Sequence, residues 1–194
     1  MSLRYILRPS LTLFLTAAVT IAALSVVHTL TLEPIEKQKQ KTREAAMAEV
    51  LPGAFEYRQL PEDRYTAPGG NSGSITAVYE CLYNGVTAGF VVQLSPAGYG
   101  GNIDLLAGIS SAGEKLTGMR VLRHSETPGL GALAVKENFY RQYDNRALVP
   151  LGVARNSPGV NDINAITSAT ITSRAITGAV NEAIRWYLEQ GRQK

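Results

Sequence analysis

The sequence has very little cysteine. Cys81 is the only one among 194 residues, and one thiol can neither form an internal disulfide nor hold an iron–sulfur cluster. We therefore expect Cys81 to be a small buried side chain. Any iron–sulfur centre that works with this chain must belong to a partner protein.

Histidine is nearly as scarce, with only His28 and His124. The sequence has no group of histidine, cysteine and acidic residues at the spacing of metal ligands. A histidine that acts as a catalytic base needs an oriented partner and a nucleophile, and neither is visible beside His124. We predict neither a metal site nor a catalytic residue.

An excess of one charge is also missing, because 19 basic and 16 acidic residues leave a net charge of only +3. The basic residues are scattered, so nothing predicts nucleic-acid binding. Residues 98–101 are rich in glycine but lack the G-x-G-x-x-G spacing of a dinucleotide-binding loop, and they precede a predicted strand instead of a helix. A Rossmann-type site is therefore excluded.

One long run contains no charged residue. Residues 11–32 are rich in Leu, Ala, Val and Ile, and as a helix they would extend for about 33 Å, enough to cross a bilayer core of about 30 Å. A cleaved signal peptide has a shorter apolar core and a small-x-small cleavage site. We therefore favour an uncleaved transmembrane anchor at 11–32, after a short flank at 1–10.

A juxtamembrane helix is predicted over residues 33–53, because 36–51 are good helix formers that end at Pro52-Gly53. Its basic residues between 37 and 43 either lie against anionic lipid headgroups or form a solvated helix face. They outnumber the two arginines before the anchor. The Lys/Arg count thus opposes export of the following domain, but long domains translocate largely regardless of charge.

Residues 54–194 have the pattern of a single α+β domain. The β-rich runs 75–83 and 86–94 are joined by Asn84-Gly85, the strongest short hairpin signal. Further predicted elements are a loop at 62–74, strands at 102–110, 116–123 and 147–153, and a helix at 133–143. Hairpin-linked strands followed by helices indicate a mainly antiparallel sheet with flanking helices.

Five hydroxyls between residues 167 and 173 precede an amphipathic helix near the C-terminus. The start of a helix offers free N–H groups and about half a positive charge, which together can hold a phosphate. Ser and Thr are also good N-caps, so the cluster alone leaves both interpretations open. Apolar residues then recur with helical spacing up to a stop at Gly191: Ile176, Ala179, Val180, Ala183, Ile184, Tyr187 and Leu188.

Residues 164–173 resemble the flavinylation motif of FMN-binding domains, usually Asp, two variable residues, Ser or Thr, Gly, Ala, Thr. In that family a flavin transferase joins the phosphate of FMN to the final threonine through a phosphoester. The resemblance makes Thr170 the attachment residue and implies covalent FMN. A flavin transferase is implied as a partner, because a threonine hydroxyl is a poor nucleophile at neutral pH. Asn164 stands in place of the Asp, and Ser168 in place of the Gly.

A second match is the sequence E-T-P-G-L-G at residues 126–131. It resembles a loop shared by the G subunit of Rnf ion-translocating electron-transport complexes and the C subunit of the sodium-pumping NADH:quinone reductase. Pro128-Gly129 within it is a strong turn dipeptide. Residues 98–101 resemble the glycine-rich segment of the same family, so the resemblance covers most of the chain after residue 40.

The resemblance implies a flavin site made of two segments. The 126–131 loop would line the isoalloxazine ring, the start of the C-terminal helix would surround the phosphate, and His124 would make a polar contact nearby. The predicted cofactor-binding residues are Glu126, Thr127, Gly129, Leu130, Gly131, Thr167, Ser168, Ala169, Thr170 and Thr172.

By this resemblance the chain is a membrane-anchored flavoprotein subunit. It would relay electrons between NADH and ferredoxin in an Rnf-type complex that translocates cations, with other membrane and iron–sulfur subunits as partners. We expect a single-pass protein of the bacterial inner membrane with its soluble domain in the periplasm. One alternative is an anchored FMN-binding sensor or regulatory module without electron relay, and another is a scaffold that has lost flavinylation because Asn164 replaces Asp.

Overall fold

The computed structural model describes residues 3–53, 56–65, 73–155 and 159–191. The chain divides into two units, Met1–Thr42 and Arg43–Lys194. Helix α1 (Leu3–Val50) is a single helix that begins in the first unit and ends in the second, just before Pro52-Gly53. Its most apolar window has a mean hydropathy of 2.1, so by length and composition α1 is able to cross a membrane.

The second unit is built on a six-stranded antiparallel sheet whose strands pair in chain order. The strands are β1 (Glu56–Gln59), β2 (Ile75–Tyr83), β3 (Val86–Leu94), β4 (Asp104–Ser110), β5 (Lys115–Arg123) and β6 (Arg146–Ala147). Strands β2 and β3 have the predicted bounds, and Asn84 and Gly85 between them both have positive φ, as a type I′ turn requires. The predicted α+β class with a mainly antiparallel sheet is confirmed.

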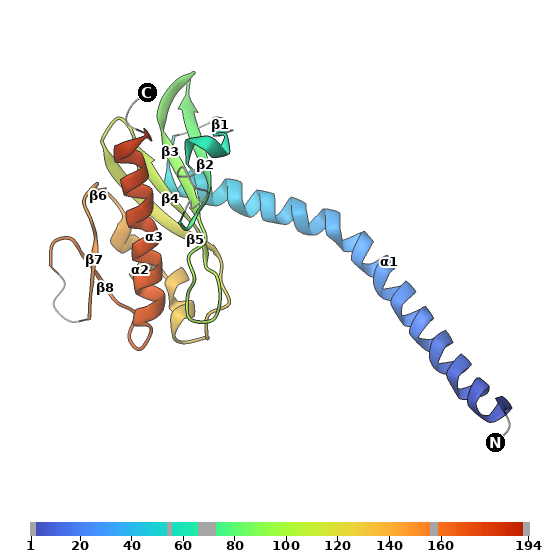
Figure 1. The fold of residues 1–194 in the computed structure, drawn as a ribbon. Helices are drawn as coiled ribbons and strands as arrows, with labels where there is room; N and C mark the ends of the chain where they lie inside the picture. The colour runs from blue at the N-terminus through green and yellow to red at the C-terminus, as the bar shows by residue number, and fades with distance from the viewer. Residues whose placement is uncertain (1–2, 54–55, 66–72, 156–158, 192–194) are drawn as a thin grey trace. The chain divides into compact units, whose positions relative to one another are not determined.

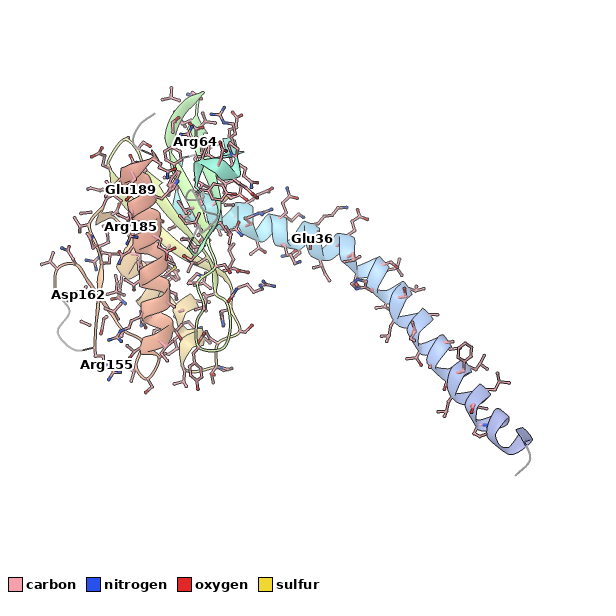
Figure 2. All side chains as sticks on the ribbon, in the orientation of Figure 1. Glu36, Arg64, Arg155, Asp162, Arg185 and Glu189 are labelled. Atoms are coloured by element: carbon pink, nitrogen blue, oxygen red, sulfur yellow. The ribbon has the colours of Figure 1, made fainter. Side chains whose placement is uncertain are left out.

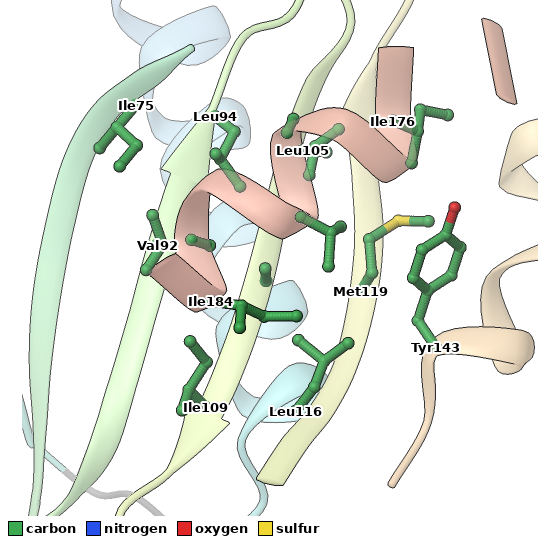
Figure 3. Close-up of a cluster of buried hydrophobic side chains, with 14 of the residues drawn as sticks. Ile75, Val92, Leu94, Leu105, Ile109, Leu116, Met119, Tyr143, Ile176 and Ile184 are labelled. Carbon is green, nitrogen blue, oxygen red and sulfur yellow. The ribbon is translucent and has the colours of Figure 1, made fainter. Parts of the chain in front are cut away.

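The two faces of the sheet pack against different parts of the chain. Neighbouring residues along a strand point to opposite faces. On β3, Val91 packs with Cys81 and with Met47 near the end of α1. Phe90 and Val92 belong instead to the larger core beneath α3 (Thr170–Glu189). Figure 1 shows α3 lying along this second face, and Figure 3 shows the apolar side chains between α3 and the strands.

Helix α3 buries the predicted stripe of apolar residues, with one exception. Leu188, at the edge of the stripe, is 43% exposed, whereas Trp186 is buried. The Trp186 ring packs edge-on against Phe90 with 5.4 Å between ring centroids, and its Nε1–H donates to the Arg64 carbonyl at 2.9 Å. Each large apolar side chain buried in this way contributes about 1.5–3 kcal/mol, so α3 is a principal part of the core.

The single helix predicted at 133–143 is wrong. A 3-10 helix (Gly131–Val135), α2 (Glu137–Tyr140) and a second 3-10 helix (Arg141–Tyr143) replace it, with Lys136 extended between the first two. Ala134, Phe139 and Tyr143 are all buried. In a continuous helix Ala134 and Phe139 would point about 140° apart, so the break at Lys136 is what lets both reach the core.

The strand predicted at 147–153 is also wrong, because Pro150 has no N–H to continue a ladder. The chain forms β6 and, after the proline, β7 (Gly152–Ala154), which pairs in parallel with β8 (Asp162–Asn164). In the predicted loop at 62–74, a 3-10 helix occupies Glu62–Arg64 and residues 66–72 lie outside the described residues. The elements that we did not predict are β1, the Glu62–Arg64 helix and β8.

Gly108 lies where the end of α1 packs closely against β4. A Cβ at position 108 would lie 2.2 Å from the Val50 carbonyl oxygen, and the Thr117 hydroxyl donates to the same oxygen. Gly108→Ala should therefore lower the free energy of unfolding by about 1–3 kcal/mol. Urea unfolding followed by the fluorescence of Trp186, the single tryptophan, measures the change.

The matched control is Gly113→Ala, because a Cβ at Gly113 would meet nothing nearer than 4.0 Å. This control should change the free energy of unfolding by less than about 0.5 kcal/mol. Equal losses for the two variants would show that the close approach of α1 to Gly108 is wrong.

Candidate functional site

A cavity of about 780 Å³ lies at one end of the sheet, and three segments form all of its wall except Arg155. They are the glycine-rich loop between β3 and β4, the loop after β5, and the chain that enters α3. The wall is formed by Tyr99, Glu126, Thr127, Leu130, Gly131, Arg155, Ala165, Ile166, Thr167, Ser168, Ala169, Thr170, Ile171 and Thr172. All the predicted site residues except Gly129 lie on this wall.

The loop after β5 is shaped by the turn that its sequence predicts. The Thr127 carbonyl accepts the N–H of Leu130 at 3.1 Å, and Gly129 has a φ of +78°. Pro128 and Gly129 thus take the central positions of a type II turn. This turn points Leu130 to the cavity wall, whereas Gly129 lies at the turn outside the wall.

Glu126 is buried, and its carboxylate accepts hydrogen bonds from both of the other segments. Oε1 accepts the backbone N–H groups of Tyr99 at 2.8 Å and Gly100 at 3.0 Å. Oε2 accepts the hydroxyl of Thr172, in the first turn of α3, at 2.7 Å. His124 makes a polar contact here as well, because its Nδ1 accepts the backbone N–H of Glu126 at 3.2 Å.

These donors keep the carboxylate ionised. Burial alone raises the pKa of Glu126, but the hydrogen bonds from Gly100, Thr172 and Tyr99, together with His124, bring the pKa below its usual value. A carboxyl whose pKa is lowered by folding stabilises the fold at neutral pH, and this contribution is lost as the pH falls through the lowered pKa. Glu126 is therefore a charged structural group at neutral pH.

The start of α3 has no side-chain cap. The first N–H groups of any α-helix have no partner within the helix. In α3 the N-cap residue is Ala169, whose side chain supplies no capping bond to them. Of the five hydroxyls, that of Ser173 accepts the Ile166 N–H and donates to the Ala169 carbonyl, both at 3.0 Å. The hydroxyl of Thr172 donates to the Glu126 carboxylate. Of the other hydroxyl-bearing residues, Thr167 and Ser168 are exposed and Thr170 is partly exposed, and all three line the cavity.

Arg155 is the one charged residue of this wall that we did not predict; the other unpredicted wall residues are Tyr99, Ala165, Ile166 and Ile171. Its Nε–H donates to the Thr170 hydroxyl oxygen at 3.1 Å, and Figure 2 shows Arg155 beside the N-terminal end of α3. Arg155 directly follows β7, whose partner β8 leads into the segment before α3. No motif includes this arginine; the parallel pairing of β7 with β8 brings it to Thr170.

The wall suits a ligand that combines an apolar ring system with an anionic group. Tyr99 is 74% exposed, Ile171 57% and Leu130 40%, and all three line the cavity. A guanidinium and free N–H groups at the start of a helix bind anions. The volume lies within the usual range for a small-molecule or cofactor site. The residues present therefore fit a flavin nucleotide such as FMN.

Comparisons with known proteins agree with this fit. Residues 98–185 match the family model described as the FMN-binding domain, and residues 1–50 match the RnfG N-terminal region. The G subunit of the Na⁺-translocating ferredoxin:NAD⁺ oxidoreductase complex of Acetobacterium woodii is 33% identical over 193 residues, covering 95% of this chain and 92% of the relative. The chain belongs to the RnfG family.

Another relative of this kind is the G subunit of the ion-translocating oxidoreductase complex of Methanosarcina acetivorans. It is 31% identical over 184 residues, which cover 92% of this chain and 93% of the relative. The crystal structure of the C subunit of the Na⁺-translocating NADH-quinone reductase from Parabacteroides distasonis superposes with a TM-score of 0.63 at 15% identity, covering 84% of this chain and 98% of the other. The two chains thus share a fold.

Ser168 has a left-handed backbone conformation, with a φ of +62°. Side chains with a Cβ adopt this region at a cost of about 1–2 kcal/mol, and β-branched residues adopt it least readily. Ser168→Val should lower the free energy of unfolding by about 1–2 kcal/mol, whereas Ser168→Gly should stay within about 0.5 kcal/mol of the wild type.

The matched control for this strain is Thr167→Val, one residue earlier. Thr167 is also exposed but is not among the residues with positive φ. Urea unfolding followed by Trp186 fluorescence compares the variants. A loss at Thr167→Val as large as at Ser168→Val would rule out backbone strain as the cause.

Proposed function

We propose that this chain is the FMN-carrying electron-transfer subunit of an ion-translocating oxidoreductase of the Rnf type. We propose further that the phosphate of FMN is joined to the Thr170 hydroxyl oxygen by a flavin transferase. Membership of the RnfG family and the match to the FMN-binding domain support the first proposal. The observation that supports the second is the position of Thr170 on the cavity wall, with Arg155 3.1 Å from its hydroxyl oxygen.

The residues around Thr170 suit a phosphate. The guanidinium of Arg155 carries a permanent positive charge next to the hydroxyl oxygen. The uncapped N–H groups of α3 and the positive end of the helix dipole add to the attraction of an anion, and such dipole effects typically amount to about 0.3–1 kcal/mol. Thr167 and Ser168 are exposed on the same wall, so their hydroxyls can donate to phosphate oxygens.

The rest of the wall would receive the ring system. When bound, FMN supplies the electron-transfer chemistry, and the protein holds it and sets its potential. Tyr99, Leu130 and Ile171 offer apolar surface for a flat ring. We assign iron–sulfur centres to other subunits, because the single cysteine, Cys81, is fully buried and its pKa is raised to about 12, chiefly by burial.

Attachment at Thr170 can be tested with the protein expressed together with a flavin transferase. Thr170→Ala should abolish flavin fluorescence of the band on a denaturing gel, because only a covalent flavin survives denaturation. Thr76→Ala is the control, since it removes an exposed hydroxyl on β2, away from the cavity wall and the motif, and should keep the fluorescence. A Thr170→Ala band as bright as the wild type would overturn the assignment.

We also propose that residues 11–32 span the bacterial inner membrane and that residues 43–194 lie in the periplasm. In α1 the threonine hydroxyls of this span have acceptors within the helix, which a lipid environment without water requires. Each donates to a carbonyl oxygen three or four residues earlier: Thr12, Thr16, Thr20, Thr29 and Thr31.

The orientation can be tested by thiol labelling. Val86 is 71% exposed in the hairpin, whereas Cys81 is 0% exposed and its raised pKa keeps it a thiol. A membrane-impermeant maleimide should therefore label Val86→Cys in cells whose outer membrane alone has been made permeable, and should leave the wild-type chain unlabelled. Labelling of Val86→Cys only after the inner membrane is broken would place the domain in the cytoplasm.

A further inference from the structure

The buried carboxylate of Glu126 joins the three segments that enclose the cavity. We propose that Glu126 is a positioning residue that acts through Thr172 to hold the first turn of α3, and with it Thr170, against the loop that would face the flavin. The consequence for the flavin rests on the proposed attachment at Thr170. The effect on the protein itself is testable without flavin.

The carboxylate oxygens are directed at the protein. Glu126 is only 7% exposed, although it lies on the cavity wall. Tyr99 and Gly100 donate to one oxygen, and Thr172 donates to the other. Both carboxylate oxygens therefore accept hydrogen bonds from the protein. Through these bonds the carboxylate holds the glycine-rich loop and the first turn of α3 in place.

Thr172 transmits this constraint to the attachment residue. Its side chain is 1% exposed, and it is two residues after Thr170 in the same first turn of α3. Ser173, the other buried hydroxyl of this turn, bonds only to Ile166 and Ala169 in the segment just before the helix. Thr172 is therefore the hydroxyl that ties this turn to the loop after β5.

The contact leaves little room for an alternative arrangement. A Cβ at Gly131 would lie 2.1 Å from Glu126 Oε2 and 2.7 Å from the Thr172 hydroxyl oxygen. The backbone of the loop thus lies directly against the hydrogen bond between Glu126 and Thr172. Loss of that hydrogen bond should loosen the start of α3 relative to the loop, while the core beneath the rest of the helix stays packed.

Thr172→Val tests the proposal, because valine keeps the shape of threonine and removes the donor. Thr177→Val is the matched control. Thr177 is 2% exposed on the same helix, and its hydroxyl bonds to Tyr143 at 2.8 Å and to the Ser173 carbonyl at 2.9 Å, away from Glu126. Both variants lose a buried hydroxyl of α3, so a purely structural role predicts the same behaviour for both. Thr172→Ser restores the donor and should behave like the wild type.

The first measurement uses the full chain without flavin. Hydrogen exchange should become at least about tenfold faster in Thr172→Val for the hydrogen-bonded amides of the two segments, those of Tyr99 and Gly100 and those of Ala169 and Ser173. It should stay unchanged in Thr172→Ser and Thr177→Val. Equal exchange in these segments for Thr172→Val and Thr177→Val would overturn the positioning role, whether or not the chain carries flavin.

The second measurement uses the flavin-loaded chain. In Thr172→Val the fluorescence of the loaded band should fall about tenfold, because small misplacements of a reacting group cost up to about 10²-fold in rate. Iodide should quench the remaining flavin at least about twice as strongly as in the wild type. Thr177→Val should match the wild type in both. If the wild type itself carries no flavin at Thr170, the proposed attachment fails while the exchange experiment still decides the role of Glu126.

Discussion

The site depends on the burial of one negative charge, that of Glu126. A carboxylate removed from water is costly unless donors replace the water, and here the donors are the N–H groups of Tyr99 and Gly100 and the hydroxyl of Thr172. These residues are far from Glu126 in the sequence, so compensation of the charge forces three separate segments to meet. The same contact explains Gly131, where any side chain would strike the carboxylate.

The sheet brings these segments within reach of one another. Strand β4 pairs with β5 so that Asp104 lies opposite Arg123, and the beginning of β4 therefore lies beside the end of β5. The glycine-rich loop before β4 and the 126–131 loop after β5 consequently share one end of the sheet. Helix α3 packs across the same sheet and begins at that end, where its free N–H groups border the cavity. An antiparallel register of neighbouring strands thus produces a site from distant residues.

What the sequence predicts well is encoded locally. The Asn84-Gly85 hairpin, the turn at Pro128-Gly129 and the stripe of α3 each follow from residues a few positions apart, and all three are present. The break at Lys136 was not predictable in this way, because it depends on the core. Ala134 and Phe139 are both buried there, although they would lie on different faces of one continuous helix. Arg155 was missed because its position also depends on distant residues: the parallel pairing of β7 with β8 brings it to Thr170.

The two departures from the flavinylation motif have different physical meanings. Ser168 stands where the motif has glycine, and its φ of +62° shows that the motif glycine meets a need of the backbone at the entry to α3. Asn164 stands where the motif has Asp, and it is held through its backbone, whose N–H donates to Gln142 Oε1 at 2.7 Å and whose carbonyl accepts from Gln142 Nε2 at 3.2 Å. Asn164 is itself exposed, so under the proposed attachment at Thr170 the position of the motif acid is open to contact by a flavin transferase.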